Sequence, residues 1–118
     1  ASDVKFHDPD SFSLGIGNII FFSCRISCDV RIGNFNLLNS LVSLGHDVTL
    51  GDRNVLNPAV RISGYSTVGN DNFFGLHSII LQGLSIGNNT RIGVSSVVLR
   101  NTKDNSIYFG NPAKRIKS

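Results

Sequence analysis

Apolar residues recur every six positions along almost the whole chain. Stepping by six from residue 14 reaches fifteen successive positions that are all Leu, Ile, Val or Phe. Because these four residue types make up about a third of the chain, random placement would fill fifteen such positions roughly once in ten million trials. The positions are Leu14, Ile20, Ile26, Ile32, Leu38, Leu44, Leu50, Leu56, Ile62, Val68, Phe74, Ile80, Ile86, Ile92 and Val98.

The position after these apolar residues is often glycine, as expected where a chain turns tightly beside its neighbours. The glycines are Gly15, Gly33, Gly45, Gly51, Gly69, Gly75, Gly87 and Gly93. This rhythm predicts short strands joined by corners. A period of six is typical of a parallel β-helix, in which three hexads make one triangular coil. The hexads therefore predict about five coils, stacked into a prism roughly 24 Å tall.

Residues eighteen apart should lie above one another in such a prism, so the third hexad position forms three columns. One column is polar and suits a solvated corner: Ile16, Asn34, Asp52, Asn70 and Asn88. The other two are not ordinary wet loops: Phe22, Ser40, Pro58, Leu76 and Val94, and Cys28, His46, Gly64, Gln82 and Arg100. A further outward column is apolar over four coils and indicates an interface: Ile19, Leu37, Val55, Phe73 and Arg91.

Composition narrows the class of protein. With 118 residues, 41% hydrophobic and 16% charged, the chain is expected to form one globular domain. A formal charge of +3 with scattered basic residues argues against nucleic-acid binding. The sequence has no membrane span and no signal-peptide pattern, which predicts a cytoplasmic protein. Cys24 and Cys28 have no second pair for a zinc site and are expected to be free thiols. We expect a lead-in over residues 1–13, the β-helix over 14–103 and a tail over 104–118.

Three features carry a family resemblance: the "[ILV]-G-x-x-x-x" hexads, the segment "NSLVSLGHD" and the closing "YFGNPAKRI". They resemble the hexapeptide-repeat acyltransferases, and within these the NeuD/PglD-like enzymes that acetylate sialic acids or nucleotide-activated amino sugars. The resemblance covers about residues 7–116. It implies an all-β, single-stranded left-handed parallel β-helix, although parallel crossovers are normally right-handed. It also implies acetyl-CoA as cosubstrate, no metal, a sugar or nucleotide-sugar acceptor, and a homotrimer whose active sites are shared between subunits.

His46 is the candidate catalytic residue. Acyl transfer needs a base for the attacking amine or hydroxyl and a donor for the oxyanion that develops on the thioester. The eighteen-residue spacing places Gly64 one coil from His46, so a backbone N–H should lie about one strand spacing away. In the resembled family the residue matching His46 is the general base, the residue matching Asp47 raises its basicity, and the residue matching Asn39 helps to orient it. The matching oxyanion donor is the amide of Gly64.

The resemblance also implies residues that bind coenzyme A. The acyl-CoA arm is expected to pass Leu76 and Val94 at a corner of a neighbouring subunit. Lys114 and Arg115 are expected near the nucleotide end, where their charge suits the phosphates. The family often has a histidine nine residues after the base, where this chain has Val55, so one thioester contact is not expected here.

Two other functions remain as alternatives. A γ-type carbonic anhydrase uses a similar prism but needs three imidazoles around zinc, including a close pair on one chain. His7, His46 and His77 are too far apart in sequence to supply that pair, and His7 and His77 are expected to be structural or exposed. A non-catalytic structural β-helix or assembly module would give no reason for Asn39, His46, Asp47 and Gly64 to coincide. We therefore favour an acetyltransferase; the acceptor, and N- against O-acetylation, stay open.

Overall fold

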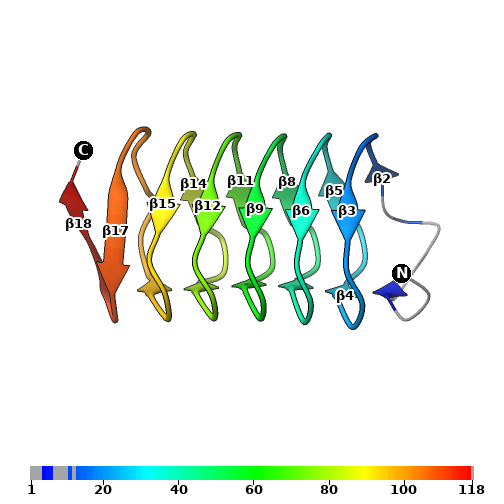
Figure 1. Ribbon diagram of the computed structural model, residues 1–118, viewed down its shortest axis with the longest axis horizontal. Coiled ribbons are helices and arrows are strands. Elements are labelled where there is room, and N and C mark those ends of the chain that lie inside the picture. Colours follow the sequence, from blue (N-terminus) through cyan, green and yellow to red (C-terminus); the bar gives the residue numbers. More distant parts are fainter. Residues whose placement is uncertain (1–3, 7–10, 12, 118) are drawn as a thin grey trace.

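The computed structural model describes residues 4–6, 11 and 13–117, and the chain forms a β-solenoid of short strands (Figure 1). Each of the fifteen predicted hexads supplies one two-residue strand that ends on the predicted apolar residue, from β2 (Ser13–Leu14) to β16 (Val97–Val98). The described part of the chain contains no helix that could cross a membrane. The hexad prediction is therefore confirmed strand by strand.

The strands stack into three parallel sheets, one for each face of a triangular prism. The first sheet contains β1 (Lys5–Phe6), β4 (Arg25–Ile26), β7 (Ser43–Leu44), β10 (Arg61–Ile62), β13 (Ile79–Ile80) and β16. The second contains β2, β5 (Arg31–Ile32), β8 (Thr49–Leu50), β11 (Thr67–Val68) and β14 (Ser85–Ile86). The third contains β3 (Ile19–Ile20), β6 (Leu37–Leu38), β9 (Val55–Leu56), β12 (Phe73–Phe74), β15 (Arg91–Ile92), β17 (Ile107–Gly110) and β18 (Ala113–Lys117).

The strand register matches the predicted coil length. In the middle of the first sheet Ile62 pairs with Ile80 and with Leu44, each eighteen residues away. Stacking in this register gives about five full coils, and the longest dimension of the molecule is 39 Å. This is longer than the stack predicted from the hexads because β1 extends it at one end and β17 and β18 extend it at the other.

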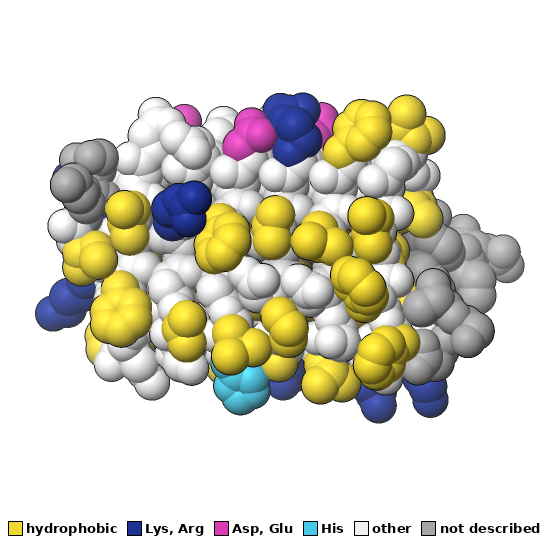
Figure 2. All heavy atoms as spheres, viewed as in Figure 1, with side chains coloured by type: hydrophobic (Ala, Val, Ile, Leu, Met, Phe, Trp, Pro, Cys, Tyr) yellow, Lys and Arg dark blue, Asp and Glu magenta, His cyan; other side chains and the backbone are white. Residues whose placement is uncertain are grey.

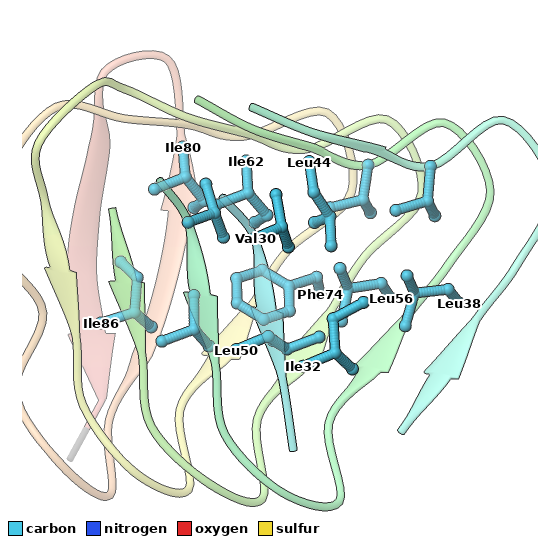
Figure 3. Close-up of a cluster of buried hydrophobic side chains, with 14 of the residues drawn as sticks. Val30, Ile32, Leu38, Leu44, Leu50, Leu56, Ile62, Phe74, Ile80 and Ile86 are labelled. Carbon is cyan, nitrogen blue, oxygen red and sulfur yellow. The ribbon is translucent and has the colours of Figure 1, made fainter. Parts of the chain in front are cut away.

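The apolar hexad residues point into the prism and form its core (Figure 3). Phe74 and its neighbours Leu56 and Leu38 from the third sheet are fully buried. Full burial of a side chain of this size contributes about 1.5–3 kcal/mol relative to exposure. The first coil is the exception, because Leu14 belongs to the same series but remains exposed at the end of the stack.

Connections of four residues join consecutive strands, and the stacked connections form the three corners of the prism. Corner 1 follows the first sheet and comprises residues 27–30, 45–48, 63–66 and 81–84. Corner 2 follows the second sheet and comprises residues 15–18, 33–36, 51–54, 69–72 and 87–90. Corner 3 follows the third sheet and comprises residues 21–24, 39–42, 57–60, 75–78 and 93–96.

The third residue of each of these corners has a positive φ, from 52° at Asn89 to 74° at Gly83. Only Gly17 and Gly83 are glycine among them, and none is β-branched, the residue class that tolerates this region least. The predicted corner glycines lie two positions earlier and are needed for a different reason. A Cβ on Gly45, for example, would lie 2.6 Å from the Gly64 nitrogen. Those glycines allow consecutive coils to approach closely, and they do not supply the positive φ of the turn.

A column of buried asparagines closes the inside of corner 2, which the sequence analysis missed. The Asn54 side chain accepts a hydrogen bond from the Asn72 N–H (3.0 Å) and donates to the Gly69 carbonyl (2.9 Å). Asn36 makes the equivalent contacts one coil earlier, with the Asn54 N–H and the Gly51 carbonyl. Each amide therefore satisfies backbone groups that would otherwise be buried without partners.

The predicted tail continues the prism before it turns back. β17 pairs in parallel with β15 after a coil shortened to sixteen residues, since Arg91 lies opposite Ile107. β18 then pairs antiparallel with β17. The buried Tyr108 fixes this end, because its hydroxyl accepts a hydrogen bond from the Lys103 N–H at 2.9 Å. At the other end, β1 pairs with β4, and most of the predicted lead-in lies outside the described residues.

Candidate active site

His46 lies on corner 1, between β7 and β8. Leu44 and Val48 on either side point into the core and are buried. Because the core holds those two residues, the side chains of His46 and Asp47 between them face outward, 47% and 41% exposed. The hexad pattern therefore places His46 and Asp47 together at the surface.

The two side chains contact each other directly. His46 Nδ1 lies 3.2 Å from Asp47 Oδ2. A carboxylate accepts hydrogen bonds, so this contact assigns the ring proton to Nδ1 and leaves the lone pair of Nε2 free. Asp47 reaches this position through its left-handed backbone conformation, with φ 59°. The pair therefore has the orientation expected of a base and its acidic partner.

Gly64 lies one coil further along the same corner, as the eighteen-residue spacing predicts. The Tyr65 N–H donates to the His46 carbonyl at 2.9 Å, which holds the two coils in this register. A Cβ on Gly64 would lie 2.9 Å from His46 Nε2 and 3.0 Å from Cε1. Any larger residue at position 64 would therefore require the imidazole to move. The free nitrogen of the ring and the backbone of Gly64 are therefore neighbours.

The backbone amides of corner 1 differ from those of corner 2. On corner 2 the N–H of each second residue donates to an Asn or Asp one coil further along, as Asp52 does to Asn70 at 2.7 Å. On corner 1 the N–H groups of His46 and Gly64 have no hydrogen-bond partner among the described residues. Corner 2 is closed by its own side chains, whereas these two N–H groups of corner 1 are not bonded to the described part of the chain.

Tyr65 was not among the predicted site residues, yet it contacts the histidine ring. The ring centroids of Tyr65 and His46 are 4.8 Å apart and the planes are nearly perpendicular, at 88°. Edge-to-face pairs of this kind are favourable. The signal in the sequence was its position eighteen residues after Asp47, which puts it on the same corner in the next coil.

Asn39 is not brought to His46 within the chain. It lies on corner 3, and β7 spans one face of the prism between it and corner 1. Its side-chain amide donates to Asn57 Oδ1 at 3.4 Å. The expectation that Asn39 orients His46 is therefore not met inside one chain, because residues seven apart fall on different corners of this fold.

Leu76 and Val94 lie where their column predicted, exposed on successive coils of corner 3. They continue an apolar surface that also covers the third sheet, and Figure 2 shows hydrophobic side chains gathered over this face. The outward residues of that sheet include Leu37, Val55 and Phe73, and the Arg91 guanidinium lies 5.0 Å from the centre of the Phe73 ring. Much of this side of the molecule is therefore apolar, while corner 1 carries the polar pair.

Lys114 and Arg115 lie on β18 and line a pocket of about 470 Å³ at the C-terminal end of the prism. Arg100 lines the same pocket and belongs to the column of His46 and Gly64. Three coils separate His46 from Arg100, which corresponds to about 14 Å along the prism. The pocket is therefore lined by three cationic side chains, and it lies three coils from His46 along the same column.

The remaining titratable groups do not add to this site. On corner 2, Arg53 Nε lies 2.8 Å from Asp71 Oδ1. The hydrogen bonding that Arg53 donates to the Asp71 carboxylate lowers the pKa of Asp71 and raises the pKa of Arg53. His77 lies exposed on corner 3, and His7 falls outside the described residues.

Within the described part of the chain, no three His, Cys, Asp or Glu side chains are grouped as a metal site. Cys24 and Cys28 form no disulfide.

Comparisons with known proteins place the fold. No family model and no curated protein matches the chain. Solved structures do match. A histidine-to-asparagine mutant of perosamine N-acetyltransferase from Caulobacter crescentus, in complex with CoA and GDP-perosamine, is 28% identical with a TM-score of 0.92. The match covers 98% of this chain and 54% of that one, so this chain spans about half the length of that enzyme.

Two further solved structures share the fold of this chain. A mutant of AntD, an N-acyltransferase from Bacillus cereus, in complex with dTDP and coenzyme A, is 20% identical with a TM-score of 0.93, over 100% of this chain and 78% of that one. The acetyltransferase domain of PglB from Neisseria gonorrhoeae is 21% identical with a TM-score of 0.80, over 96% of this chain and 57% of that one. The narrower NeuD/PglD-like grouping stays a prediction. The chain has the left-handed parallel β-helix fold, which it shares with structures described as an N-acetyltransferase, an N-acyltransferase and an acetyltransferase domain.

Proposed function

We propose that this chain is an acetyl-CoA-dependent acetyltransferase that acts on a sugar or nucleotide sugar, with His46 as general base. One observation carries the proposal: the His46 ring is held by the Asp47 carboxylate on one side and has its free nitrogen beside the backbone of Gly64 on the other. A base beside an unpaired backbone donor is the arrangement that acyl transfer requires. The similar enzymes crystallised with CoA make acetyl-CoA the fitting donor.

The chemistry follows from the two neighbouring groups. An acceptor nitrogen attacks the thioester carbonyl carbon while His46 Nε2 takes a proton from that nitrogen. The carbonyl oxygen becomes an oxyanion, which accepts a hydrogen bond from the Gly64 N–H. The carbon–sulfur bond then breaks, and the CoA thiolate leaves and takes up the proton from His46. Asp47 stabilises the imidazolium that exists between these two proton transfers.

An amine is the acceptor group that we favour. The similar structures include a perosamine N-acetyltransferase with GDP-perosamine bound and AntD, described as an N-acyltransferase, with dTDP-4-amino-4,6-dideoxyglucose bound. A histidine base serves an amine or a hydroxyl equally well, so the preference rests on those acceptors. The substrate class that follows is a nucleotide-activated amino sugar.

The donor is proposed to extend from corner 1 toward the C-terminal pocket. Lys114 and Arg115 line that pocket with Arg100, and cationic side chains suit the phosphates of coenzyme A. Leu76 and Val94 are exposed on corner 3, where they are proposed to contact the acyl-CoA arm bound to an adjacent subunit.

A homotrimer is the proposed assembly. The apolar face of the third sheet and corner 3 is the surface available for subunit contact. Asn39 lies on corner 3, beside that face, and β7 separates it from the His46 of its own chain. In a trimer the corner 3 of one subunit can meet the corner 1 of the next, which would allow Asn39 to orient the histidine of its neighbour.

An acceptor screen tests the proposal. Wild-type protein is incubated with acetyl-CoA and GDP-perosamine, dTDP-4-amino-4,6-dideoxyglucose or UDP-amino sugars, and thiol release is followed together with the mass of the product. A gain of one acetyl group on an amino sugar, at a rate that depends on acceptor concentration, supports the proposal. Thiol release that is the same with and without every acceptor would contradict it.

A further inference from the structure

Lys5 and Arg25 lie side by side on neighbouring strands at the N-terminal end of the prism. β1 and β4 pair in parallel, and their register places Lys5 opposite Arg25. Both side chains are exposed. At a strand spacing of about 4.8 Å, like charges directly opposite each other are destabilising. The strand pairing therefore gives no reason for two cations at these positions, and a ligand of opposite charge would.

Neither cation is neutralised within the described part of the chain. Arg53 on corner 2 forms an ion pair with Asp71, whereas Lys5 and Arg25 form none with a described residue. The described aspartates lie on corners 1 and 2 or between β16 and β17, and the described residues of the first sheet and of corner 3 include no acid. This part of the surface is therefore positively charged.

The two cations line a pocket of about 300 Å³ together with Ser23, Cys24 and Leu41. Ser23 occupies the left-handed position of corner 3, with φ 61°, and adds a hydroxyl group to the pocket. Cys24 is buried, and its thiol donates to the Asn39 carbonyl at 3.1 Å, so this wall of the pocket is fixed to the next coil. An ammonium, a guanidinium and a hydroxyl group are suitable donors for the oxygens of a phosphate or diphosphate.

The pocket lies on the other side of the base from the pocket proposed for coenzyme A. Arg25 pairs with Ser43, which belongs to the coil of His46, so Arg25 lies one coil before the base. Arg100 lies three coils after it. In the proposed trimer, corner 3 of one subunit meets corner 1 of the next, and parallel prisms related by a three-fold axis would keep each coil at the same height. The pocket of one subunit would then lie beside the coil that precedes the His46 of its neighbour.

We propose that Lys5, Arg25 and Ser23 bind the diphosphate of the nucleotide-sugar acceptor. The inference rests on the proposed function and its trimer, and it deepens them because it names residues that hold the acceptor. In a 4-amino sugar nucleotide the diphosphate and the amine lie at opposite ends of the sugar ring. A diphosphate bound in this pocket therefore leaves the amine free to reach His46 Nε2 of the adjacent subunit, while the donor occupies the coils on the C-terminal side of the base.

Two charge-removing substitutions and a matched control test the site. Lys5→Gln and Arg25→Gln each replace one cation by a neutral polar side chain. Arg31→Gln is the control, because Arg31 is an exposed arginine at the same strand position on the second sheet, where its register partners are Ser13 and Thr49. Calorimetric titration measures the binding of GDP-perosamine, dTDP-4-amino-4,6-dideoxyglucose and CoA to each protein and requires no turnover.

Lys5→Gln and Arg25→Gln are each expected to weaken the binding of both nucleotide sugars about tenfold, the scale of one lost charge-assisted hydrogen bond, and to leave the Kd of CoA within about twofold. Arg31→Gln should change neither Kd. Since each test variant removes one of two like charges, it should be at least as stable as wild type in urea denaturation. Unchanged nucleotide-sugar binding, an equal loss of CoA binding, or a clear loss of stability in both variants overturns the site.

Acetyl transfer by the same proteins separates a failure of the site from a failure of the proposed function. If wild type binds the nucleotide sugars but transfers no acetyl group, the proposed function fails, while weaker binding by Arg25→Gln still supports the site. If wild type transfers acetyl groups and Arg25→Gln binds both nucleotide sugars normally, the site fails and the proposed function stands. A wild type that binds neither nucleotide sugar contradicts the site.

Discussion

Substitution of Gly64 by alanine probes the contact between the base and its neighbouring coil. The added Cβ would lie 2.9 Å from His46 Nε2, 3.0 Å from Cε1 and 3.2 Å from Cδ2. Non-bonded heavy atoms reach their best separation at about 3.5 Å or more, so the ring must move by roughly 0.6 Å. His46 is an exposed side chain and can move, and Gly64 has no positive φ that alanine would strain. The perturbation is therefore local.

A displacement of this size is expected to lower kcat with little change in stability. Misplacement of a catalytic group by about 1 Å can cost a hundredfold in rate, so we expect a loss of about tenfold or more from Gly64→Ala. The KM for acetyl-CoA should change less than kcat, because the cationic pocket at the C-terminal end is untouched. Steady-state thiol release at saturating acceptor measures the effect, and urea denaturation measures the stability.

Gly69→Ala is the matched control for this experiment. Its Cβ would lie 2.8 Å from the Gly87 carbonyl oxygen, so it crowds the next coil on corner 2, away from His46. We expect it to lose stability and keep its kcat. If Gly64→Ala is folded and keeps a normal kcat, or if Gly69→Ala loses kcat to the same extent, the placement of the base beside Gly64 does not matter for catalysis.

Three further predictions concern the core, the assembly and the tail. Asn54→Leu should lower the free energy of unfolding by about 2–5 kcal/mol in urea denaturation, since it leaves two buried backbone groups without partners; a loss below about 1 kcal/mol would show that the asparagine column is not required. Phe73→Glu should convert a trimer to monomers in light scattering, and a monomeric wild type that is fully active would refute the shared site. The double change Lys114→Ala and Arg115→Ala should raise the KM for acetyl-CoA several-fold and remove the preference of the enzyme for acetyl-CoA over dephospho-acetyl-CoA. An unchanged preference would mean that Lys114 and Arg115 face solvent and do not contact the 3′-phosphate.

The hexad repeat allowed the fold to be predicted in detail because a β-helix is nearly one-dimensional. Each coil contacts only the coils next to it, so a period of six and a register of eighteen fix which residues pair. The same register predicted that His46 and Gly64 would be neighbours, since both lie on corner 1. The handedness came only with the family resemblance, because spacing along the chain is the same for either hand.

The site was predicted less completely, for reasons that the corners explain. The family resemblance implied that Asn39 helps to orient His46, and the structure places the two on different corners, so that role stays a prediction for a contact between subunits. The register of eighteen placed Tyr65 on corner 1, but its contact with the ring of His46 was missed because that contact depends on the direction of the Tyr65 side chain. The Asn54 column was visible as a polar residue every eighteen positions, but polar residues on the inside of a corner were not expected.

The most direct test of the account compares His46→Ala with His77→Asn in acetyl transfer to an amino-sugar nucleotide. Both histidines are exposed on corners of the prism, but only His46 has an acidic partner and lies beside Gly64. The account predicts that His46→Ala lowers kcat by at least about a hundredfold, within the range of a general base, while His77→Asn stays near wild type. Binding of CoA should be retained by both variants. A folded His46→Ala variant that turns over at a near-normal rate would contradict the account.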